Sequence, residues 1–513
     1  MRKIFLAALF ILLSCIPAAA NVQAHSTFSD NMVLQRYMKV PVWGTADPGE
    51  SIRVHFNGQT VTTKADSDGK WEVELAPMKA GGPFKMLLVG NNNVLFENVM
   101  VGEVWVCSGQ SNMWWTVKLS NNSDQEIADA KYPNIRLFTV PAAMAAEPTS
   151  DLNAKWVECS PETVPNFSAA AYYFGCELFK TLNVPVGLIH TSWGGTPAES
   201  WTSLPVLKSD PDFDLIVKRY DDQIAGYEKV KAEYPGLLAQ WEKDAEKAKA
   251  EGKPAPEKPK EAAYNPWIPS SLYNAMIAPL IPYGIKGAIW YQGESNAAKA
   301  YQYRKLFPDM IKNWRKDWGE GDFPFLFVQL ANFAPVSQEP IDDQWAELRE
   351  AQTMTLSLKN TGMALAIDIG DPNNIHPGNK QEVGRRLALN ALGIAYGKKL
   401  AYSGPIYRAM EPEYGTIVLV FNHLGGGLVA KGDTLKGFTI AGADKKFVNA
   451  QAEIQGDKIV VCSDKIAKPA AVRFGWANFP VVNLWNKAGL PASPFRTDNW
   501  PGLTWPKPAE KGK

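Results

Sequence analysis

Hydrophobic and polar positions alternate in short runs from residue 26 to about residue 98. Such runs cover residues 51–56, 69–75 and 85–89, and Asp-Pro-Gly, Asn-Gly and Asp-Gly turns separate them. Alternation with a period of two predicts strands with one buried face, and the turn dipeptides predict hairpins. We therefore expect an N-terminal β-sandwich domain over residues 25–100.

From residue 101 the pattern changes to nearly continuous hydrophobic runs, at residues 184–190, 285–291 and 325–330. Segments with helical periodicity, such as 169–180 and 381–390, alternate with them. Continuous hydrophobic strands between helices are typical of a parallel sheet that is covered on both faces. The pattern predicts an α/β domain over residues 101–402.

Two further segments depart from this pattern. Residues 210–263 are charged and helix-prone, and then become rich in Lys, Pro, Glu and Ala, which predicts a solvated helical insertion with a flexible stretch. Short alternating strands return after residue 402, for example at 416–421 and 458–462. These strands predict a C-terminal β domain over residues 403–513.

Residues 1–24 have a basic start, a hydrophobic run too short to span a bilayer comfortably, and small residues at the end. This is the pattern of a secretory signal peptide, with cleavage after Ala20 or Ala24. Leu-Leu-Ser-Cys15 also resembles a lipoprotein cleavage box, but simple cleavage is favoured. No later run is long and hydrophobic enough for a membrane span. We expect the mature protein outside the cytoplasm, either secreted or periplasmic.

The composition narrows the classes of partner. Lys and Arg number 53, as do Asp and Glu, so the charge balance does not favour nucleic acid or an anionic membrane surface. Small or neutral ligands fit better, and the 18 Trp and 17 Tyr include side chains that can stack on sugars. Four cysteines remain after the leader, and their spacing leaves three disulfide pairings and free thiols equally open. These four cysteines are Cys107, Cys159, Cys176 and Cys462.

Chemically useful residues follow several of the predicted strands. Ser111 follows the strand at 104–106, with Gly109 permitting a tight turn. If a helix begins there, its amides can hold an oxyanion near the serine. Gly194 and Gly195 let a backbone amide approach a ligand closely. Because ligands gather at the carboxyl ends of parallel strands, these positions indicate one site.

Two later strand ends add side chains of other kinds. Gln292 and Asn296 follow the strand at 285–291 and can donate hydrogen bonds to an oxyanion, and Glu294 lies between them. Residues 366–380 carry acids and a histidine on a loop rich in Pro and Gly, directly before a helix.

A serine needs a base to act as a nucleophile at neutral pH, and the chain has only five histidines. His25 lies at the signal junction, His55 in the first β domain and His423 in the last. His190 ends an α/β strand and is a competitor. His376 has the loop position, the neighbouring acids and the place in chain order that a general base requires, so it is the preferred candidate.

Four motifs together resemble the sialate O-acetylesterase family of the SGNH-hydrolase superfamily. They are Ser-Gly-Gln-Ser-Asn-Met at 108–113, Trp-Gly-Gly-Thr at 193–196, Trp-Tyr-Gln-Gly-Glu-Ser-Asn at 290–296 and Asp-Pro-Asn-Asn-Ile-His-Pro at 371–377. The resemblance implies a flavodoxin-like α/β/α domain flanked by N- and C-terminal β-sandwich-like domains. It also implies removal of O-acetyl groups from sugars, typically from 9-O-acetylated sialic acids, with no metal and no organic cofactor.

The resemblance assigns roles to individual residues. It implies Ser111 as nucleophile and His376 as base, with the acid of the triad unsettled because the usual positions hold Asn373 and Asn374. We expect Asp371 to orient His376, with Glu382 or Glu294 as substitutes. The implied oxyanion donors are the backbone amides of Ser111, Gly194 and Gly195 and the side chains of Gln292 and Asn296. The implied substrate-binding residues are Gln110 and Glu294.

Other functions remain open from the sequence. The same ester chemistry serves an acetylxylan or other polysaccharide acetylesterase. A glycosidase that uses Glu294 needs a second acid, and none lies in an equally good setting. A non-catalytic carbohydrate-binding protein is the alternative from a different class. The sequence does not indicate an oligomeric state.

Overall fold

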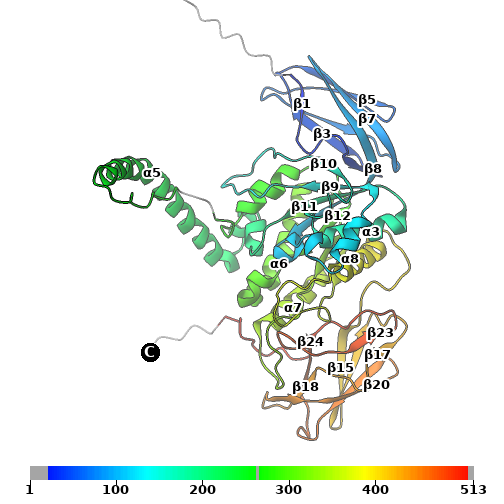
Figure 1. Ribbon diagram of the computed structural model, residues 1–513. Helices are drawn as coiled ribbons and strands as arrows, with labels where there is room; N and C mark the ends of the chain where they lie inside the picture. Colours follow the sequence, from blue (N-terminus) through cyan, green and yellow to red (C-terminus); the bar gives the residue numbers. More distant parts are fainter. Residues whose placement is uncertain (1–20, 262–264, 507–513) are drawn as a thin grey trace, which may run out of the picture.

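The computed structural model of the chain describes residues 21–261 and 265–506 (Figure 1). Most of the predicted signal peptide, with Cys15 and the cleavage position Ala20, therefore lies outside the described residues. The described part has a mixed α/β architecture, with one large mixed sheet and several antiparallel sheets around it.

The central part of the large sheet is parallel apart from one edge strand. Every connection between its parallel strands passes through a helix or a long loop, as parallel pairing requires. The carboxyl ends of the parallel strands therefore meet at one edge. In spatial order the strands are β10 (Trp156–Cys159, the antiparallel one), β9 (Tyr132–Thr139), β11 (Val186–Ser192), β8 (Asn93–Gly109), β12 (Gly287–Tyr291), β13 (Phe325–Val328) and β14 (Thr361–Ala364).

Helices cover both faces of this sheet, as the hydrophobic runs predict. Successive residues of β8 point to opposite faces, so that Val104 and Val106 enter one core, while Trp105 and Cys107 enter the other. The first core includes α6 (Ala300–Trp318) and α7 (Gln344–Met354). The second includes α3 (Ala169–Leu182) and α8 (Lys380–Ile394).

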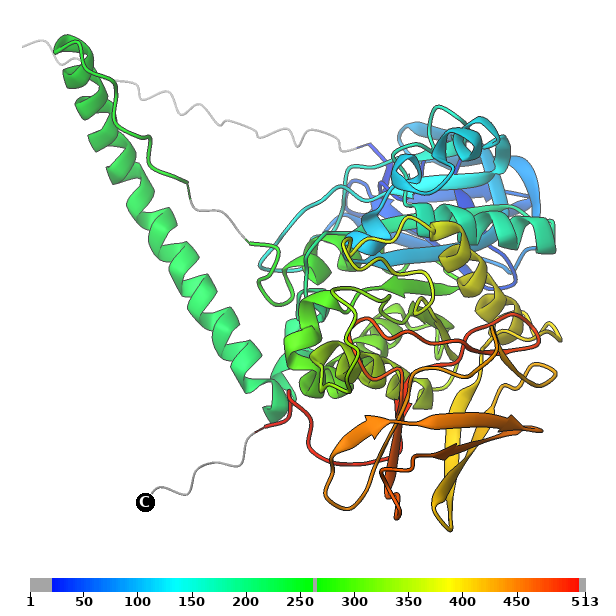
Figure 2. The same cartoon turned by 60° about the horizontal axis from the view of Figure 1, so that its bottom comes forward.

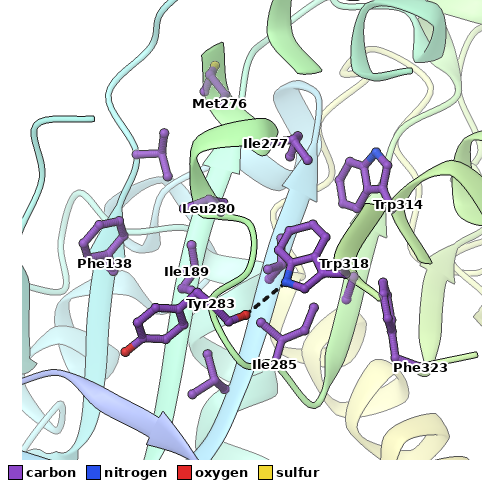
Figure 3. Packing of buried hydrophobic residues seen from close by; sticks show 14 of the residues in the cluster. Phe138, Ile189, Met276, Ile277, Leu280, Tyr283, Ile285, Trp314, Trp318 and Phe323 are labelled. Atoms are coloured by element: carbon purple, nitrogen blue, oxygen red, sulfur yellow. Dashed lines mark hydrogen bonds between the residues drawn. The ribbon is translucent and has the colours of Figure 1, made fainter. Parts of the chain in front are cut away.

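Aromatic side chains fill much of the first core (Figure 3). The indole N–H of Trp318 donates to the carbonyl oxygen of Tyr283 at 3.0 Å. The hydroxyl of Tyr283 donates in turn to the carbonyl of Val33 at 2.8 Å, in the N-terminal part of the chain. Satisfying these polar groups allows the aromatic rings to be fully buried without an unpaired donor.

The N-terminal strands form two layers, of which one continues into the central sheet. The antiparallel sheet β1-β3-β6 is separate from it. β8 makes the other layer continuous, because its first half pairs with β7 in antiparallel fashion, residues 100–102 pair in parallel with β2, and its second half pairs in parallel with β11 and β12. The domain boundary expected at residue 101 thus falls inside a continuous strand. The N-terminal strands are β1 (Gln23–Ala24), β2 (Val33–Gln35), β3 (Val40–Thr45), β4 (Ser51–Phe56), β5 (Gln59–Lys64), β6 (Lys70–Leu75) and β7 (Gly81–Val89).

The C-terminal strands form three further antiparallel sheets around a hydrophobic core of their own. Their orders are β15-β16-β21-β20, β19-β18-β22-β24 and β17-β23. The bounds are β15 (Ile406–Glu413), β16 (Thr416–Asn422), β17 (Leu428–Ala430), β18 (Phe438–Ala441), β19 (Phe447–Asn449), β20 (Gln451–Gln455), β21 (Lys458–Cys462), β22 (Ala471–Phe474), β23 (Leu484–Asn486) and β24 (Phe495–Arg496).

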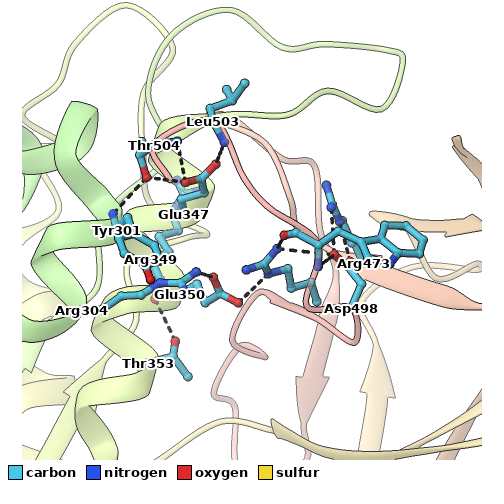
Figure 4. Close-up of polar contacts among 12 residues, drawn as sticks. Tyr301, Arg304, Glu347, Arg349, Glu350, Thr353, Arg473, Asp498, Leu503 and Thr504 are labelled. Carbon is cyan, nitrogen blue, oxygen red and sulfur yellow. Dashed lines mark hydrogen bonds and ion pairs between the residues drawn. The ribbon is translucent and has the colours of Figure 1, made fainter. Parts of the chain in front are cut away.

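Charged side chains join the C-terminal part to the helices of the central sheet (Figure 4). Glu350 on α7 accepts hydrogen bonds from Arg304 on α6 at 2.5 Å and from Arg496 on β24 at 2.7 Å. Asp498 pairs with Arg473 at 2.9 Å. Glu347 accepts from the backbone of Thr504 at 3.1 Å. These contacts place the C-terminal segment against α6 and α7.

In its described part, the insertion predicted over residues 210–263 contains the long helix α5 (Asp214–Ala250), which projects away from the rest of the molecule (Figure 2). Only Ile216 and Tyr220, near its start, are buried. The indole of Trp241 donates to the carbonyl of Pro256 at 2.8 Å, so the returning chain packs against the helix. The shorter helices of the chain are α2 (Ser123–Ala128), α4 (Leu204–Lys208), η1 (Val117–Leu119), η2 (Ala198–Trp201), η3 (Pro211–Phe213), η4 (Tyr273–Ile277), η5 (Ala278–Leu280), η6 (Glu294–Lys299) and η7 (Thr355–Ser357).

The four cysteines of the described residues are free thiols rather than disulfides. Burial raises the pKa of Cys159 to about 12 and the pKa of Cys107 well above its usual value. These thiols act as small hydrophobic core residues. Within residues 21–261 and 265–506, no helix is long and hydrophobic enough to cross a membrane.

Candidate active site

Ser111 lies at the carboxyl end of β8, where it opens the short helix α1 (Ser111–Trp114). Gly109 permits the turn, since its φ is +143° and a Cβ at this position would lie 2.2 Å from the carbonyl oxygen of Tyr291. The N–H of Gln110 donates to that same oxygen at 3.0 Å. The end of β8 is therefore packed directly against the end of β12, and this contact fixes the direction in which the serine leaves the sheet.

The structure brings Ser111 and His376 together. The Nε2 atom of His376 lies 2.8 Å from the Oγ atom of Ser111, although the two residues are 265 positions apart. His376 belongs to the loop between β14 and α8, which follows the carboxyl end of a parallel strand, as Ser111 does. A hydrogen bond of this length is the arrangement that a nucleophile and its general base require.

The ring of His376 is stacked on the indole of Trp115, with centroids 4.9 Å apart and an angle of 18° between the planes. Burial lowers the pKa of His376 below its usual value, and the charge of Lys380 lowers it further. Both effects on the pKa favour the neutral imidazole, which is the form that can accept a proton.

The competing histidine, His190, is buried on β11 and shares a 2.6 Å hydrogen bond with Ser192. Burial lowers the pKa of His190 to about 4. Among the described residues it forms no hydrogen bond with Ser111.

The carboxylates considered for the triad have other partners. Asp371 is exposed and accepts from the backbone N–H of Asn373 at 2.8 Å. Glu382 is bound by Arg385 at 2.6 Å and by Arg386 at 2.8 Å. Within the described part of the chain, no carboxylate forms a hydrogen bond or an ion pair with His376.

One of the asparagines at the usual acid positions holds the loop itself. The side-chain oxygen of Asn374 accepts the backbone N–H of His376 at 2.9 Å. The loop conformation at the histidine is thus supported by a neutral side chain.

The two glycines predicted as oxyanion donors lie beside the serine. A Cβ at Gly194 would be 3.5 Å from the Cβ of Ser111, so the two residues are in contact. Gly195 has a φ of +74°, and its carbonyl oxygen accepts from the indole of Trp267 at 2.5 Å. In the described part of the chain, the N–H groups of Ser111, Gly194 and Gly195 have no acceptor. Three backbone donors are accordingly left for a ligand near the serine.

Gln292 and Asn296, also predicted as oxyanion donors, are fully buried and bonded to other residues. The Nε2 atom of Gln292 donates to the carbonyl of Thr196 at 3.2 Å and to Oδ1 of Asn296 at 2.7 Å. The Nδ2 atom of Asn296 donates to Glu199 at 2.9 Å. The structure therefore places these amides beneath the segment that contains Gly194 and Gly195, where they support it.

The residues predicted to bind substrate are also bonded to protein groups. The Oε1 atom of Gln110 accepts from the backbone N–H of Gly293 at 3.4 Å and of Ser295 at 3.3 Å, which ties the serine turn to the loop after β12. The Oε1 atom of Glu294 accepts from Asn112 at 2.6 Å. Burial raises the pKa of Glu294 above its usual value.

Sequence reasoning missed the importance of Lys380, which donates to the side chain of Asn112 at 2.7 Å. Lys380 is the first residue of α8 and is fully buried. A cation is electrostatically unfavourable at the N-terminus of a helix. A lysine at that position, four residues after the candidate base, was the signal in the sequence.

Two exposed indoles border the serine. Trp114 ends α1 and is 49% exposed, and Trp267 is 47% exposed while its N–H is bonded to Gly195. Exposed aromatic faces of this kind can stack on a sugar ring. Throughout the residues that the structure describes, no group of three or more His, Cys, Asp or Glu side chains is arranged to hold a metal ion.

Comparison with known proteins identifies relatives over most of the chain. Residues 101–253 and 261–393 match the family model described as carbohydrate esterase, sialic acid-specific acetylesterase. The chain is 34% identical to the sialate O-acetylesterase of Mus musculus over 427 residues, which cover 75% of this chain and 76% of that protein. Identity to the sialate O-acetylesterase of Homo sapiens is 33% over 427 residues, covering 75% and 73%.

A solved structure extends the similarity beyond the matched family region. The crystal structure of a carbohydrate acetylesterase from Xanthomonas citri has 37% sequence identity and a TM-score of 0.80. The alignment covers 93% of this chain and all of the other. Both Ser111 and His376 fall within the residues that the family model matches.

Proposed function

The chain belongs to the sialic acid-specific acetylesterase family of carbohydrate esterases, and we propose that it is a serine esterase that removes O-acetyl groups from sugars. The observation that carries this proposal is the 2.8 Å contact between Ser111 Oγ and His376 Nε2 at the carboxyl edge of the sheet. A pure binding protein has no need of a serine held against a neutral histidine.

In the proposed mechanism, Ser111 Oγ attacks the acetyl carbonyl carbon while Nε2 of His376 takes the hydroxyl proton. The tetrahedral intermediate collapses when His376 gives this proton to the departing sugar oxygen, which leaves an acetyl-enzyme. Water then attacks the acetyl group as His376 removes its proton. The second intermediate releases acetate and returns the proton to Ser111.

The oxyanion of each tetrahedral intermediate needs hydrogen-bond donors. We assign this role to the backbone N–H groups of Ser111, Gly194 and Gly195, whose donors have no other acceptor in the described residues. Loss of one such donor costs roughly 3–4 kcal/mol of transition-state stabilisation in related chemistry. Gln292 and Asn296 act in this proposal by supporting the glycine turn, because their amides are bonded to Thr196 and Glu199.

The proposed substrate is an O-acetylated sialic acid, most simply a 9-O-acetylated one, because the curated relatives are named sialate O-acetylesterases. The alternative is an acetylated polysaccharide such as acetylxylan. The relative with the greater coverage is named a carbohydrate acetylesterase, a name that covers both kinds of substrate. Trp114 and Trp267 would stack on sugar faces in either case.

Two further proposals concern the type of fold and the export of the protein. We propose that the central parallel sheet and its helices are an SGNH-type hydrolase domain flanked by β domains. We also propose an exported protein with a cleaved leader. Cleavage after Ala20 rather than Ala24 is favoured because Val22 is fully buried, and because Gln23 and Ala24 form β1, paired with β3. N-terminal sequencing of the secreted or periplasmic protein tests the position.

The Ser111→Ala variant tests the proposed activity, since it removes the nucleophile and nothing else. We expect it to lose acetate release from 9-O-acetyl-N-acetylneuraminic acid and to lose labelling by a fluorophosphonate. Ser108→Ala is the matched control: Ser108 lies in β8, three residues before Ser111, and its buried hydroxyl has no hydrogen-bond partner among the described residues. Activity retained in Ser111→Ala overturns the proposal. Release from acetylated xylan alone identifies the alternative substrate.

A further inference from the structure

The backbone carbonyl groups of both neighbours of His376 are held by side chains close to the serine turn. The carbonyl of Ile375 accepts from Nδ2 of Asn112 at 3.1 Å, and the carbonyl of Pro377 accepts from Nζ of Lys380 at 2.7 Å. Lys380 also donates to Oδ1 of Asn112 at 2.7 Å. Asn112 directly follows Ser111, so one connected set of hydrogen bonds runs from the serine turn to both neighbours of His376.

The amine of Lys380 is enclosed by aromatic rings. It lies 5.4 Å from the ring centre of Tyr291 and 5.7 Å from that of Trp115, the residue on which His376 stacks. Its hydrogen bonds reach one side-chain oxygen and one carbonyl oxygen. A buried amine needs such acceptors, because leaving it unpaired costs several kcal/mol. The two rings and the two oxygen atoms together therefore form an environment suited to the buried amine of Lys380.

Several elements place charged or titratable groups around Lys380 and His376. Lys380 belongs to α8, Glu294 to η6, Tyr291 to β12 and Ser111 to α1. Glu294 is linked to Lys380 through Asn112, whose Nδ2 atom donates to Oε1 of Glu294 at 2.6 Å. The Oε2 atom of Glu294 is buried and has no hydrogen-bond partner in the described residues.

We propose that Asn112 and Lys380 are positioning residues that hold the His376 loop against Ser111 through its backbone, in place of a carboxylate on the imidazole. The proposal rests on the proposed roles of Ser111 and His376. In a Ser-His-Asp triad, the aspartate fixes the orientation of the ring and stabilises the imidazolium. Here the stacking on Trp115 fixes the plane of the ring, and the two bonded carbonyls fix the loop.

Lys380 also has an electrostatic effect opposite to that of a triad aspartate. Burial lowers the pKa of Lys380 to about 7, and interaction with Glu294 opposes this shift. When protonated, Lys380 lowers the pKa of His376 in addition to the effect of burial. Only neutral His376 can accept the proton of Ser111. Because its pKa is lowered, the active form persists to more acidic pH, and the acidic fall of kcat/KM should begin at a lower pH than an ordinary histidine would give.

The test compares the full-length mature protein with Lys380→Met and Lys380→Gln, using 4-nitrophenyl acetate from pH 5 to pH 8. Lys380→Met removes both the charge and the donor. We expect kcat to fall about a hundredfold, because misplacement of a reacting group by about 1 Å causes a loss of this size. KM should stay within about twofold of the wild-type value. We expect the acidic limb of kcat/KM to move to higher pH by roughly one unit. Lys380→Gln keeps a donor, so it should show the limb shift with a smaller loss of kcat.

Controls separate this proposal from the assignment of the nucleophile. Lys118→Met removes an exposed charge that is bonded only to Asn166, and it should leave the limb unchanged. An active Ser111→Ala variant refutes the proposed function. Suppose that Ser111→Ala is inactive and that both Lys380 variants keep the wild-type kcat and the wild-type acidic limb of kcat/KM. This result refutes only the positioning role of Lys380. If Lys380→Met does not fold, Lys380→Gln decides the question, and an unchanged limb in that variant overturns the proposal.

Discussion

Replacement of Gly109 by alanine should damage both stability and catalysis, because Gly109 is where β8 ends against β12. An added Cβ would lie 2.2 Å from the carbonyl oxygen of Tyr291 and 2.7 Å from its carbonyl carbon. Both are backbone atoms of a central strand, so no side-chain rotation can relieve the overlap. The φ of +143° is also one that alanine rarely adopts.

The magnitude follows from these two effects. The backbone conformation costs alanine about 1–3 kcal/mol, and overpacking costs about 1–3 kcal/mol. Together they predict a loss of about 2–6 kcal/mol, a large part of the ~5–15 kcal/mol that stabilises a typical protein. Moving the Cβ from 2.2 Å to an ordinary contact of 3.4 Å shifts the serine turn by about 1 Å. A displacement of this size predicts a loss of about a hundredfold in kcat.

The assay combines urea unfolding with kcat/KM for 4-nitrophenyl acetate, measured on folded protein. Gly415→Ala is the matched control, because Gly415 also has a positive φ, +74°, but a Cβ there meets nothing within 4 Å. It should lose only about 1–2 kcal/mol and keep its activity. If Gly109→Ala is no less stable than Gly415→Ala and retains wild-type kcat, the close approach of β8 to β12 does not position the serine.

Three further outcomes are expected. Asp371→Asn should lower kcat less than tenfold, because Asp371 bonds only the backbone of Asn373, whereas loss of a triad aspartate costs about 10⁴-fold; a loss of that size would restore Asp371 as the acid. Arg349→Met should lower the free energy of unfolding in urea by at least about 3 kcal/mol, because the buried guanidinium donates to five oxygen atoms; a loss below 1 kcal/mol would contradict this. The buried thiols Cys107, Cys159 and Cys176 should react with a thiol reagent at pH 8 only after unfolding, and rapid reaction of the native protein would contradict their burial.

The general architecture followed from hydrophobic patterning because burial on both faces leaves a direct mark on sequence. The continuous runs at 184–190, 285–291 and 325–330 are β11, β12 and β13, and the parallel arrangement of these strands was predicted. The continuity of β8 was not. Exposed and partly buried residues alternate in its first half, whereas its second half is uniformly buried, and this change marks a change of environment rather than the end of a strand. Pairing partners on either side of a strand are tertiary information.

The helical insertion shows a similar limit. Its charged, helix-prone sequence predicted a solvated helix, and α5 is such a helix. Its 37-residue length was not predicted, since Pro235 lies within it and proline ordinarily ends or kinks a helix.

Within the candidate site, the sequence identified the groups whose chemistry is rare. Only five histidines made His376 selectable, and the structure places its ring against Ser111. Amide side chains are common and bond wherever an acceptor is near, so the pattern could not show that Gln292 donates to Thr196 and Asn296. The orientation of Asp371 likewise depends on the turn formed by its loop, which its neighbours in sequence do not specify.

Within residues 21–261 and 265–506, no carboxylate is bonded to the imidazole of His376, and the buried Lys380 suggests a reason. Lys380 interacts electrostatically with Glu294, and Asn112 links the two by hydrogen bonds to each. A second carboxylate placed on the imidazole would add another buried negative charge and raise the pKa of His376, whereas Lys380 lowers it. Neutral asparagines at positions 373 and 374 avoid this opposition, and Asn374 still supports the loop through the backbone of His376. In the proposed arrangement, the candidate base is therefore positioned through the carbonyl oxygens of its two neighbours rather than through its ring nitrogen, and a lysine can donate to these oxygens whereas an ionised aspartate cannot.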